Sequence, residues 1–455
     1  MTSHDITLFS YPCLKHILTH FEASFRFLLS RQLPSIRIAE KSSPLKIDLL
    51  HFGPLQFTIN TTEFQLGVIR TCELPAELPV QYAVKNAHGG IHYDLDEYGV
   101  ANREVEILPG DVVLDRNGAR VEEPRFEDME QKLRISMVRQ GLERLENPQE
   151  DVLDALRYQG EPLEFRCYDY NTIEKLQIEI LPHRFRMDRA KNLYSNYLQL
   201  TITPKGEKLQ DKQLERVEYN SKLCLAAKYI LSALFGQRSG KIIVKRFEFS
   251  GNILRVPIDL KLQVQELIVS RNPTDSIPII SKILHDFPLE SIELQDPLHL
   301  QEQLQDPIVQ NSKHLRIIPG PSLDLQWLEI FKELKNEKVY WQNGCFSLVE
   351  SVGFIKDCVE NPRKIGTFYE FGVRRAKFSK EIIEKLEDFP NAQHAVLESL
   401  DNAPTFPNIF TIPLTFEAEL NIYGVESKII EIPWIFRMEV VKRGTARIMD
   451  SNQFE

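Results

Sequence analysis

The sequence predicts an α/β protein with a short helical N-terminus, a β-rich middle region, an α/β solenoid of repeated units and a β-rich C-terminal cap. Three observations lead to this fold class. Apolar residues recur every three or four positions near the N-terminus. Apolar and polar residues alternate in the middle region. One strand-and-turn pattern then returns along the second half. These changes divide the chain into residues 1–43, 44–210, 211–379 and 380–455.

Residues 8–42 have the spacing of short amphipathic helices. Pro12 stands where a helix tolerates proline, at its first turn, and the Leu33-Pro34 step interrupts the pattern. The apolar positions that share a helical face are Leu14, Ile17, Leu18, Phe21, Phe25, Leu28 and Leu29. The first segment is therefore expected to be a small group of helices, each with one apolar side.

The middle region changes to the alternation that is typical of strands. Strands are predicted at residues 46–49, 56–59, 64–69, 163–168, 176–180 and 197–203, with an irregular loop at 86–98. A charged amphipathic helix is predicted near 126–146 and another helix at 151–158. The apolar spacing of residues 214–235 predicts a long helix.

The strongest pattern in the sequence is a repeat. Residues 244–252 and 264–272 both have the form apolar-x-x-apolar-x-apolar-x-x-Asn, ending at Asn252 and Asn272. This is the strand and turn of a leucine-rich repeat, in which the asparagine turns the chain and bonds to the backbone. The aligned second apolar positions are Phe247, Leu267, Ile292, Leu315, Val339 and Phe368, and their spacing falls in the roughly 20–29 residues typical of such repeats.

Helix-like stretches separate the repeat strands at residues 277–285, 298–305, 325–334 and 347–359. Strand, turn and helix repeated in this order predict a leucine-rich-repeat-like α/β solenoid. An ordinary α/β sheet with short crossovers is the alternative, because only two units keep the asparagine. The tail is expected to form a helix at 381–389 and strands at 411–419 and 429–441 that cap the solenoid.

Composition excludes several classes of function. The chain has 455 residues and a formal net charge of −10, whereas proteins that bind nucleic acid usually carry an excess of basic residues. The sequence contains no run of 18 apolar residues, so no membrane span is predicted. The N-terminus also lacks the apolar region of a signal peptide. The six cysteines form no C-x-x-C pair, which favours reduced thiols in an intracellular protein, cytoplasmic or nuclear.

Candidate motifs for catalysis or metal binding fail on their chemistry. Residues 236–241 resemble a phosphate loop, but Ile242 stands where a magnesium-binding Ser or Thr is required. The Asp94-x-Asp96 segment has no glutamate at the twelfth position of a calcium loop, and the Gly-Gly between His88 and His92 breaks a zinc-binding helix. The basic runs at 183–191 and 374–377 are expected to be solvated. The sequence thus predicts no enzyme, no metal and no cofactor.

Three segments carry a resemblance to a known family. The N-terminal Tyr11-Pro12-x-Leu14-x-x-Ile17-Leu18-x-x-Phe21 resembles the opening of an F-box, with Tyr11 in place of the usual leucine. The loop at residues 89–99 (GGIHYDLDEYG) and the stretch 227–294 look like the nematode-expanded proteins of the F-box-C type. Those proteins carry a large associated domain of unknown function.

This resemblance implies a non-catalytic adaptor of a cullin-type ubiquitin ligase. An F-box docks apolar helices on a Skp-type linker protein, and the associated domain would present a surface to an unknown protein substrate. The linker contacts that the resemblance implies are Pro12, Leu14, Ile17, Leu18 and Phe21. Two alternatives remain open: these side chains pack into the protein's own core, or the chain is a stand-alone interaction protein without a link to a ligase. Neither a nucleic acid nor a membrane is expected as a partner.

Overall fold

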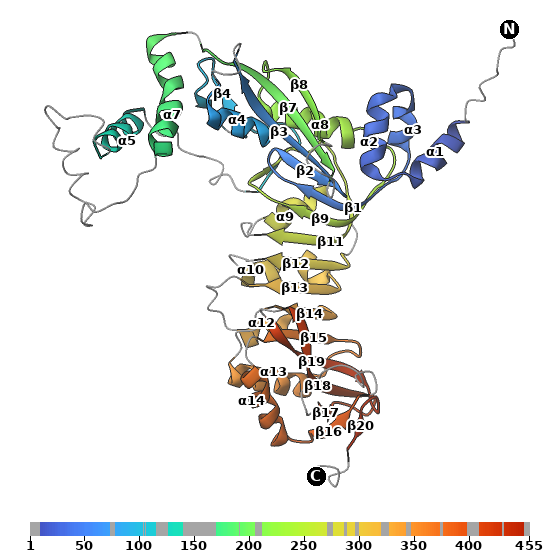
Figure 1. Ribbon diagram of the computed structural model, residues 1–455. Coiled ribbons are helices and arrows are strands. Elements are labelled where there is room, and N and C mark those ends of the chain that lie inside the picture. The colour runs from blue at the N-terminus through green and yellow to red at the C-terminus, as the bar shows by residue number, and fades with distance from the viewer. Residues whose placement is uncertain are drawn as a thin grey trace. The chain divides into compact units, whose positions relative to one another are not determined.

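The computed structural model contains both helices and strands throughout the chain (Figure 1). It describes residues 10–72, 78–102, 104, 106–114, 126–139, 170–190, 192–204, 212–270, 276–285, 289–295, 300–319, 327–342, 347–373, 376–397, 409–429 and 432–449. The chain forms two compact units: unit 1 comprises residues 1–52, 237–254 and 259–455, and unit 2 comprises 53–236 and 255–258. The α/β class with N-terminal helices is therefore confirmed. The helix expected at 151–158 and the strand expected at 163–168 lie outside the described residues.

Unit 1 begins with a group of short helices. These are α1 (Tyr11–His20), α2 (Ala23–Gln32), the 3-10 helix η1 (Pro34–Ile36) and α3 (Arg37–Ser42). Pro12 lies in the first turn of α1, where its missing N–H leaves no bond unmade. The Glu22 carboxylate accepts a hydrogen bond from the Phe25 N–H and so caps the start of α2. Prolines and a capping carboxylate thus set the helix boundaries.

A parallel sheet follows these helices in unit 1. Its strands are β1 (Leu45–Phe52), β9 (Ile242–Phe249), β11 (Gln263–Ser270), β12 (Ser291–Gln295), β13 (His314–Ile318), β14 (Lys338–Trp341) and β15 (Phe368–Val373). They pair in this order, each parallel to the next. The short strand β10 (Ile253–Leu254) follows β9 in the chain. Figure 1 shows the strands from β9 to β15 as a ladder of nearly parallel arrows.

The register of this ladder places the aligned repeat positions in one row. Leu267 pairs with both Phe247 and Ile292, Leu315 follows Ile292, and Val339 follows Leu315. The last aligned position is one residue off, because Val339 pairs with Tyr369 and not with Phe368. A shift of one residue exchanges the two faces of a strand. Tyr369 accordingly lies in the core, whereas the guanidinium of Arg437 lies over the ring of Phe368.

Of the predicted structural repeat positions, Phe247, Leu267 and Ile292 are fully buried. Asn252 lies in a bend directly after β9, and Asn272 lies outside the described residues. The helices that connect the strands are α9 (Ser276–Ile280), η4 (Ser281–Ile283), α10 (Leu300–Leu304), α11 (Pro307–Asn311), α12 (Trp327–Glu333) and α13 (Leu348–Glu360). Their inner side chains, such as Phe331 and Phe354, contact the strand residues Trp341 and Phe371 and complete an aromatic core.

Antiparallel strands end unit 1. After α14 (Ala376–Glu387) come β16 (Gln393–Val396), β17 (Ile409–Pro413), β18 (Ala418–Ile429), β19 (Ile432–Lys442) and β20 (Arg447–Ile448). Strand β19 pairs antiparallel with β15, so the parallel ladder passes directly into this antiparallel group. The strand expected at 411–419 is wrong, because residues 414–417 form the turn between β17 and β18, whereas most of the strand expected at 429–441 is found as β19.

Unit 2 is built on an antiparallel sheet of β2 (Gln56–Ile59), β3 (Thr62–Thr71), β7 (Ser195–Pro204) and β8 (Gln213–Glu218), paired in that order. The long helix predicted at 214–235 is wrong at its start. Residues Gln213–Glu218 form β8, and helix α8 spans only Leu223–Phe235. Pairing with β7 overrides the local helical spacing, because a strand's preference depends mainly on its neighbours.

Two helices of unit 2 pack on each other. They are α5 (Phe126–Arg139) and α7 (Tyr170–Asp188), and their interface buries Met129, Leu133 and Ile180. The strand predicted at 176–180 is therefore wrong, because these residues lie inside α7. A short apolar run is compatible with both the helical spacing and the alternation of a strand, so the elements that pack against it decide which one it forms. None of the helices among the described residues is long and apolar enough to cross a membrane.

The Gly-Gly loop of unit 2 is held against β3. It follows α4 (Val80–Ala87) and leads into the paired strands β4 (Asp94–Leu95) and β5 (Ala101–Asn102), with β6 (Val112–Val113) further along. Gly89 and Gly90 have φ angles of 94° and 95°, which favour glycine. A Cβ on Gly90 would meet the Val68 carbonyl oxygen at 2.6 Å. Glycine is thus required here both by conformation and by close approach of two backbones.

Candidate partner-binding surfaces

The N-terminal helices divide their apolar side chains between the interior and the surface. Leu18 on α1 and Phe27 on α2 are buried, and Leu14 and Ile17 are half-buried. Pro12 is exposed. The five residues of the F-box-like pattern therefore do not share one environment. A partner protein has access to Pro12 and to parts of Leu14 and Ile17, but none to the fully buried Leu18.

Apolar side chains are exposed at both ends of α1: Tyr11 and Pro12 at its start, and Phe21 at its end beside Phe25 of α2. We call these four residues the apolar patch. Phe21 is 38% exposed, and Tyr11 and Phe25 are each 49% exposed. The rings of Phe21 and Phe25 meet edge to face with their centroids 5.3 Å apart, a favourable aromatic geometry. Exposed apolar side chains that contact each other, as Phe21 and Phe25 do, mark interaction sites more often than isolated ones do.

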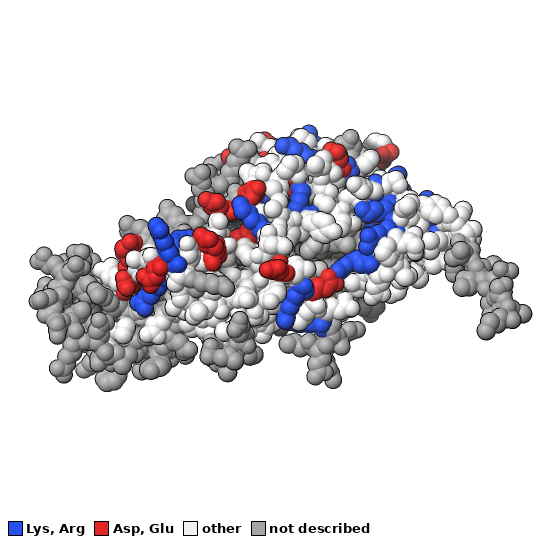
Figure 2. Space-filling model, turned by 90° about the horizontal axis from the view of Figure 1, so that it is seen from above, with Lys and Arg blue, Asp and Glu red and all other residues white. Residues whose placement is uncertain are grey.

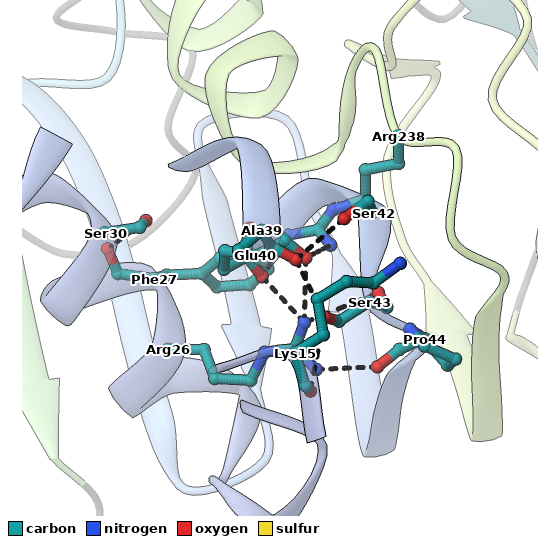
Figure 3. A network of polar contacts seen from close by, with 10 residues as sticks. All are labelled: Lys15, Arg26, Phe27, Ser30, Ala39, Glu40, Ser42, Ser43, Pro44 and Arg238. Carbon is teal, nitrogen blue, oxygen red and sulfur yellow. Dashed lines mark hydrogen bonds and ion pairs between the residues drawn. The ribbon is translucent and has the colours of Figure 1, made fainter. Parts of the chain in front are cut away.

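A buried cluster of charges joins α2 and α3 to the segment before β9 (Figure 3). The Glu40 carboxylate lies 3.1 Å from the guanidinium of Arg26 and 2.6 Å from that of Arg238. The exposed fraction of all three side chains is 2% or less. Arg26 also donates to the carbonyl oxygen of Pro44 at 2.7 Å. We call Arg26, Glu40 and Arg238 the buried triad.

The Glu40 carboxylate is the counter-charge that both guanidinium groups of the buried triad share. Desolvation lowers the pKa of Arg26, and the nearby Glu40 carboxylate partly reverses that effect. The guanidinium of Arg238 also lies 5.3 Å from the centre of the Phe27 ring. Removing Glu40 would leave two guanidinium groups in the interior without a counter-charge, which is strongly unfavourable. The triad therefore fixes α2 and α3 onto the parallel sheet of unit 1.

The segment that resembles a phosphate loop takes part in this attachment. Arg238 belongs to the buried triad, and the N–H of Gly240 donates to the Lys41 carbonyl oxygen at 3.1 Å. A Cβ on Gly240 would meet the Ser43 carbonyl oxygen at 2.4 Å, so a larger residue would push the two segments apart. The Leu45 N–H completes the contact by donating to the Lys241 carbonyl oxygen at 2.8 Å. In this structure the segment holds helix α3 in place.

A row of charged and aromatic side chains crosses the outer face of the unit 1 sheet. Successive strands from β12 to β15, and then β19, place these residues directly opposite one another: Glu293, Arg316, Tyr340, Glu370 and Arg437. We call them the charged row. All five are partly exposed. This regular spacing follows from the ladder register, in which equivalent positions of neighbouring strands lie about 4.8 Å apart.

Contacts within the charged row hold its side chains in defined positions. Arg316 lies 3.5 Å from the Glu293 carboxylate and 4.6 Å from the centre of the Tyr340 ring. Arg437 makes a 2.7 Å ion pair with Glu370. Burial raises the pKa of the Tyr340 hydroxyl, so this side chain is neutral at physiological pH and offers a hydrogen-bond donor. The row combines the arginine and tyrosine side chains that dominate binding at protein interfaces.

Both signs of charge occur on the surface. Figure 2 shows Lys and Arg side chains spread among Asp and Glu side chains over the face viewed from above. Part of the basic run at 183–191 pairs within unit 2, because Arg186 lies 2.7 Å from Asp96 and Arg184 lies 3.6 Å from Glu130. Residues 374 and 375 of the second basic run lie outside the described residues.

The acidic loop that resembles a calcium site has a structural role. Asp94 accepts hydrogen bonds from the Leu223 N–H at 2.6 Å and from the Tyr219 hydroxyl at 2.8 Å, and so holds the start of α8. Asp96 accepts from the N–H groups of Tyr98 and Val100. Within the described part of the chain, no group of three or more His, Cys, Asp or Glu side chains is placed to hold a metal ion.

The thiols are expected to differ sharply in reactivity. Cys13 on α1 is exposed, whereas Cys358 on α13 is fully buried and desolvation raises its pKa to about 12. Because only the thiolate reacts, a rise from 9.0 lowers the thiolate fraction about a thousandfold at neutral pH. Brief treatment with iodoacetamide followed by peptide mapping should label Cys13 and leave Cys358 free. Equal labelling of both would contradict the packing of α13.

Sequence reasoning missed several residues of these surfaces. Arg26, Glu40 and Arg238 are far apart in the chain, and no spacing rule brings them together. Arg316 and Tyr340 are variable positions between the apolar positions of the repeat, so a repeat pattern says nothing about their identity. The alignment of the repeat strands was the one signal in the sequence for the charged row. It implied that outward-facing residues at equivalent positions of neighbouring strands would lie side by side.

Comparison with known proteins identifies one region. Residues 222–375 match a protein family described as a domain of unknown function, DUF3557. This range begins at helix α8 and includes the ladder from β9 to β15. No curated protein and no solved structure matches the chain.

Proposed function

We propose that this protein is a non-catalytic adaptor that brings a protein substrate to a cullin-type ubiquitin ligase. The apolar patch on α1 and α2 is the observation that carries the proposal, since the F-box-like pattern leads one to expect docking helices there. Pro12, Leu14, Ile17 and Phe21 would contact a Skp-type linker protein, with Phe25 added to this set by its exposure. Leu18 would support the contact from inside.

An adaptor must hold its two partners in a defined geometry. The helices and the parallel ladder belong to the same compact unit, and the buried triad ties them together through Arg26, Glu40 and Arg238. Ubiquitin transfer takes place on other subunits of such a ligase, so the adaptor needs surfaces and spacing instead of nucleophiles. An intracellular location, cytoplasmic or nuclear, follows from this role.

The substrate would bind the outer face of a leucine-rich-repeat-like ladder. The matched register of Phe247, Leu267 and Ile292 supports this repeat interpretation, with the asparagine-containing turn kept in only some units. In such repeats the outward side chains of the strands form an extended binding surface. Here that surface is the charged row, in which Arg316 and Tyr340 are the expected anchors because Arg and Tyr are enriched at binding hot spots.

Linker binding provides the test. Phe21→Asp and Phe25→Asp should each weaken binding of a purified Skp-type linker by about thirtyfold or more, because a charge replaces an apolar anchor. Val349→Asp is the matched control, since Val349 on α13 is 81% exposed and lies outside the apolar patch. Affinities are measured by biolayer interferometry, and circular dichroism melts check that each variant stays folded.

A footprint on the same helix gives an independent readout. Cys13 lies next to Pro12, so bound linker should slow the alkylation of Cys13 and leave the overall fold unchanged. Failure of the wild-type protein to bind the linker would end the ligase proposal. Capture of a protein substrate through the charged row in that case would favour the stand-alone interaction protein. Equal loss of binding in Val349→Asp would show that the effect is not specific to the patch.

A further inference from the structure

The sheet of unit 2 ends in a strand with an open edge. β8 pairs with β7 on one side, and within the described residues no strand pairs with its other side. All six residues of β8 are exposed. The edge of a sheet presents backbone N–H and C=O groups that lack partners, and these groups accept an added strand.

The hydrogen bonds beside β8 show which groups face outward. The Tyr219 N–H donates to the Asn196 carbonyl oxygen, at the position next to the pair Glu218 and Tyr197. Along an antiparallel ladder, hydrogen-bonded and non-bonded pairs of residues alternate. Residues of a bonded pair point their N–H and C=O groups at the partner strand, and residues of a non-bonded pair point theirs to the opposite side. The backbone groups of Leu214 and Arg216, together with the Glu218 N–H, therefore point away from β7. The Glu218 carbonyl oxygen accepts from the Asn220 N–H, so the open edge ends there.

The side chains of β8 give this edge only partial protection against pairing. Sheet edges are commonly protected by proline, lysine, bulges or very short strands. β8 has six residues, neither proline nor lysine, and a regular register with β7. Leu214 is 48% exposed and Val217 is 61% exposed, and they lie on opposite faces of the strand. An added strand would gain an apolar contact on each face.

A polar cleft opens where β8 ends. Its volume is about 830 Å³, and its lining includes Glu218 and the residues that follow it, together with the start of β7 around Tyr197. Glu97 and Tyr98 from the loop after β4 line the same cleft. A peptide strand that continued beyond β8 would enter this cleft, which offers side-chain contacts where the backbone contacts stop.

Charge indicates the composition of the added strand. Glu215 and Glu218 lie on opposite faces of β8, and Glu97 lines the cleft. The cleft also contains the cations Arg189 and Lys222, of which Lys222 pairs with Glu106 at 2.9 Å. The single positive residue of the strand, Arg216, donates to the neutral Gln199 side chain at 2.8 Å and is outnumbered by the two glutamates of β8. Opposite charges across a strand pair are favourable. A partner strand with apolar and basic residues on both faces therefore fits this edge best.

Pairing of β8 with a second copy of itself fits less well. When two copies of β8 pair antiparallel, residues that lie opposite each other must both point their backbone N–H and C=O groups at the other copy, or both point them away. The two registers centred on the strand then place Glu215 opposite Glu215, or Arg216 opposite Arg216. Like charges in this position are unfavourable, so charge disfavours the centred forms of self-association.

We propose that the edge of β8 and the adjoining cleft bind an extended peptide segment of a partner protein, rich in apolar and basic residues, by strand addition. This site belongs to unit 2 and is separate from the apolar patch and the charged row of unit 1. The backbone groups of Leu214, Arg216 and Glu218 supply most of the affinity. The glutamates and the cleft select the sequence of the peptide.

The probe is a synthetic peptide of about ten residues that repeats Val-Val-Lys-Lys, which gives each face of an extended strand both residue types. Binding to the full-length protein is measured by fluorescence anisotropy. Arg216→Pro should weaken binding about tenfold or more, because proline removes an outward N–H and leaves the ladder to β7 intact. Arg216→Ala removes the same side chain but keeps the N–H, and its affinity should stay within about twofold of wild type.

Two further probes leave the protein unchanged. A peptide of the same sequence with every amide N-methylated should lose binding, because it offers no N–H to β8 in any register. A peptide repeating Val-Val-Glu-Glu should bind at least about tenfold more weakly.

Three outcomes would overturn the proposal. The parent peptide does not bind, the fully N-methylated peptide binds like the parent, or Arg216→Pro and Arg216→Ala bind alike. Dimerisation that depends on protein concentration and is lost in Arg216→Pro, in the absence of peptide binding, would assign the edge to a second copy instead. The experiment does not involve the linker, so its result is independent of the adaptor proposal.

Discussion

Replacement of Glu40 by alanine is expected to lower the free energy of unfolding of unit 1 by about 3–5 kcal/mol. The change leaves the guanidinium groups of Arg26 and Arg238 close together in the interior without a counter-charge. Coulomb repulsion and the missing hydrogen bonds then act in the same direction. Urea unfolding followed by circular dichroism measures the loss, because the unit 1 helices contribute directly to that signal.

A matched variant separates charge burial from a simple loss of packing. The triple change Arg26→Met, Glu40→Leu and Arg238→Met removes the buried triad as a whole, and it is expected to keep most of the wild-type stability. Apolar residues of similar volume often replace buried ion clusters without loss. A loss below about 1 kcal/mol in Glu40→Ala would show that the triad is not buried as described. Linker binding should also weaken in Glu40→Ala, since α3 loses its attachment.

Replacement of Trp341 by alanine is expected to lower the free energy of unfolding by about 3–5 kcal/mol. Trp341 is fully buried at the end of β14, and its ring centre lies 5.5 Å from that of Phe331 on α12. The truncation removes a large apolar surface and leaves a cavity that the rigid ladder refills only in part. Thermal melting followed by circular dichroism gives the size of the effect.

The neighbouring residue supplies the control. Tyr340 occupies the same strand on the opposite, partly exposed face, so Tyr340→Ala should lower the free energy of unfolding by only about 1 kcal/mol. The two substitutions differ mainly in the face of the sheet that they affect. Similar losses for both would mean that the register of β14 differs by one residue from that described, since such a shift exchanges its faces.

The row of parallel strands from β9 to β14 is the part of the fold that the amino-acid pattern predicted best. The spacing of the aligned apolar positions is a local signal, because each of them faces the core beside its own strand and the two neighbouring strands. The row of Phe247, Leu267, Ile292, Leu315 and Val339 followed from it. The interval before Phe368 is the longest, and there the alignment was one residue off. A longer connection allows more registers, and spacing alone does not distinguish them.

Elements without a repeat were predicted less well. Residues 213–218 and 176–180 fit both a helical and a strand pattern, and their partners decided the outcome: β7 beside the first, α5 beside the second. The candidate sites show the same limit. Phe25 was recognised as apolar, but its exposure depends on how α2 packs, and the contact between Glu40 and Arg238 spans a large separation in the chain.

The amino-acid order alone thus determined the α/β class, the short N-terminal helices and the repeated strands, because each of these depends on spacing within one element. It also reduced the expectation of an enzyme, since no motif had the residues that its chemistry requires. Only the tertiary structure decided which apolar side chains of α1 and α2 stay exposed, which charges become buried together, and which strand keeps an open edge. These properties depend on neighbours that are distant in the chain, and pattern carries no information about such neighbours.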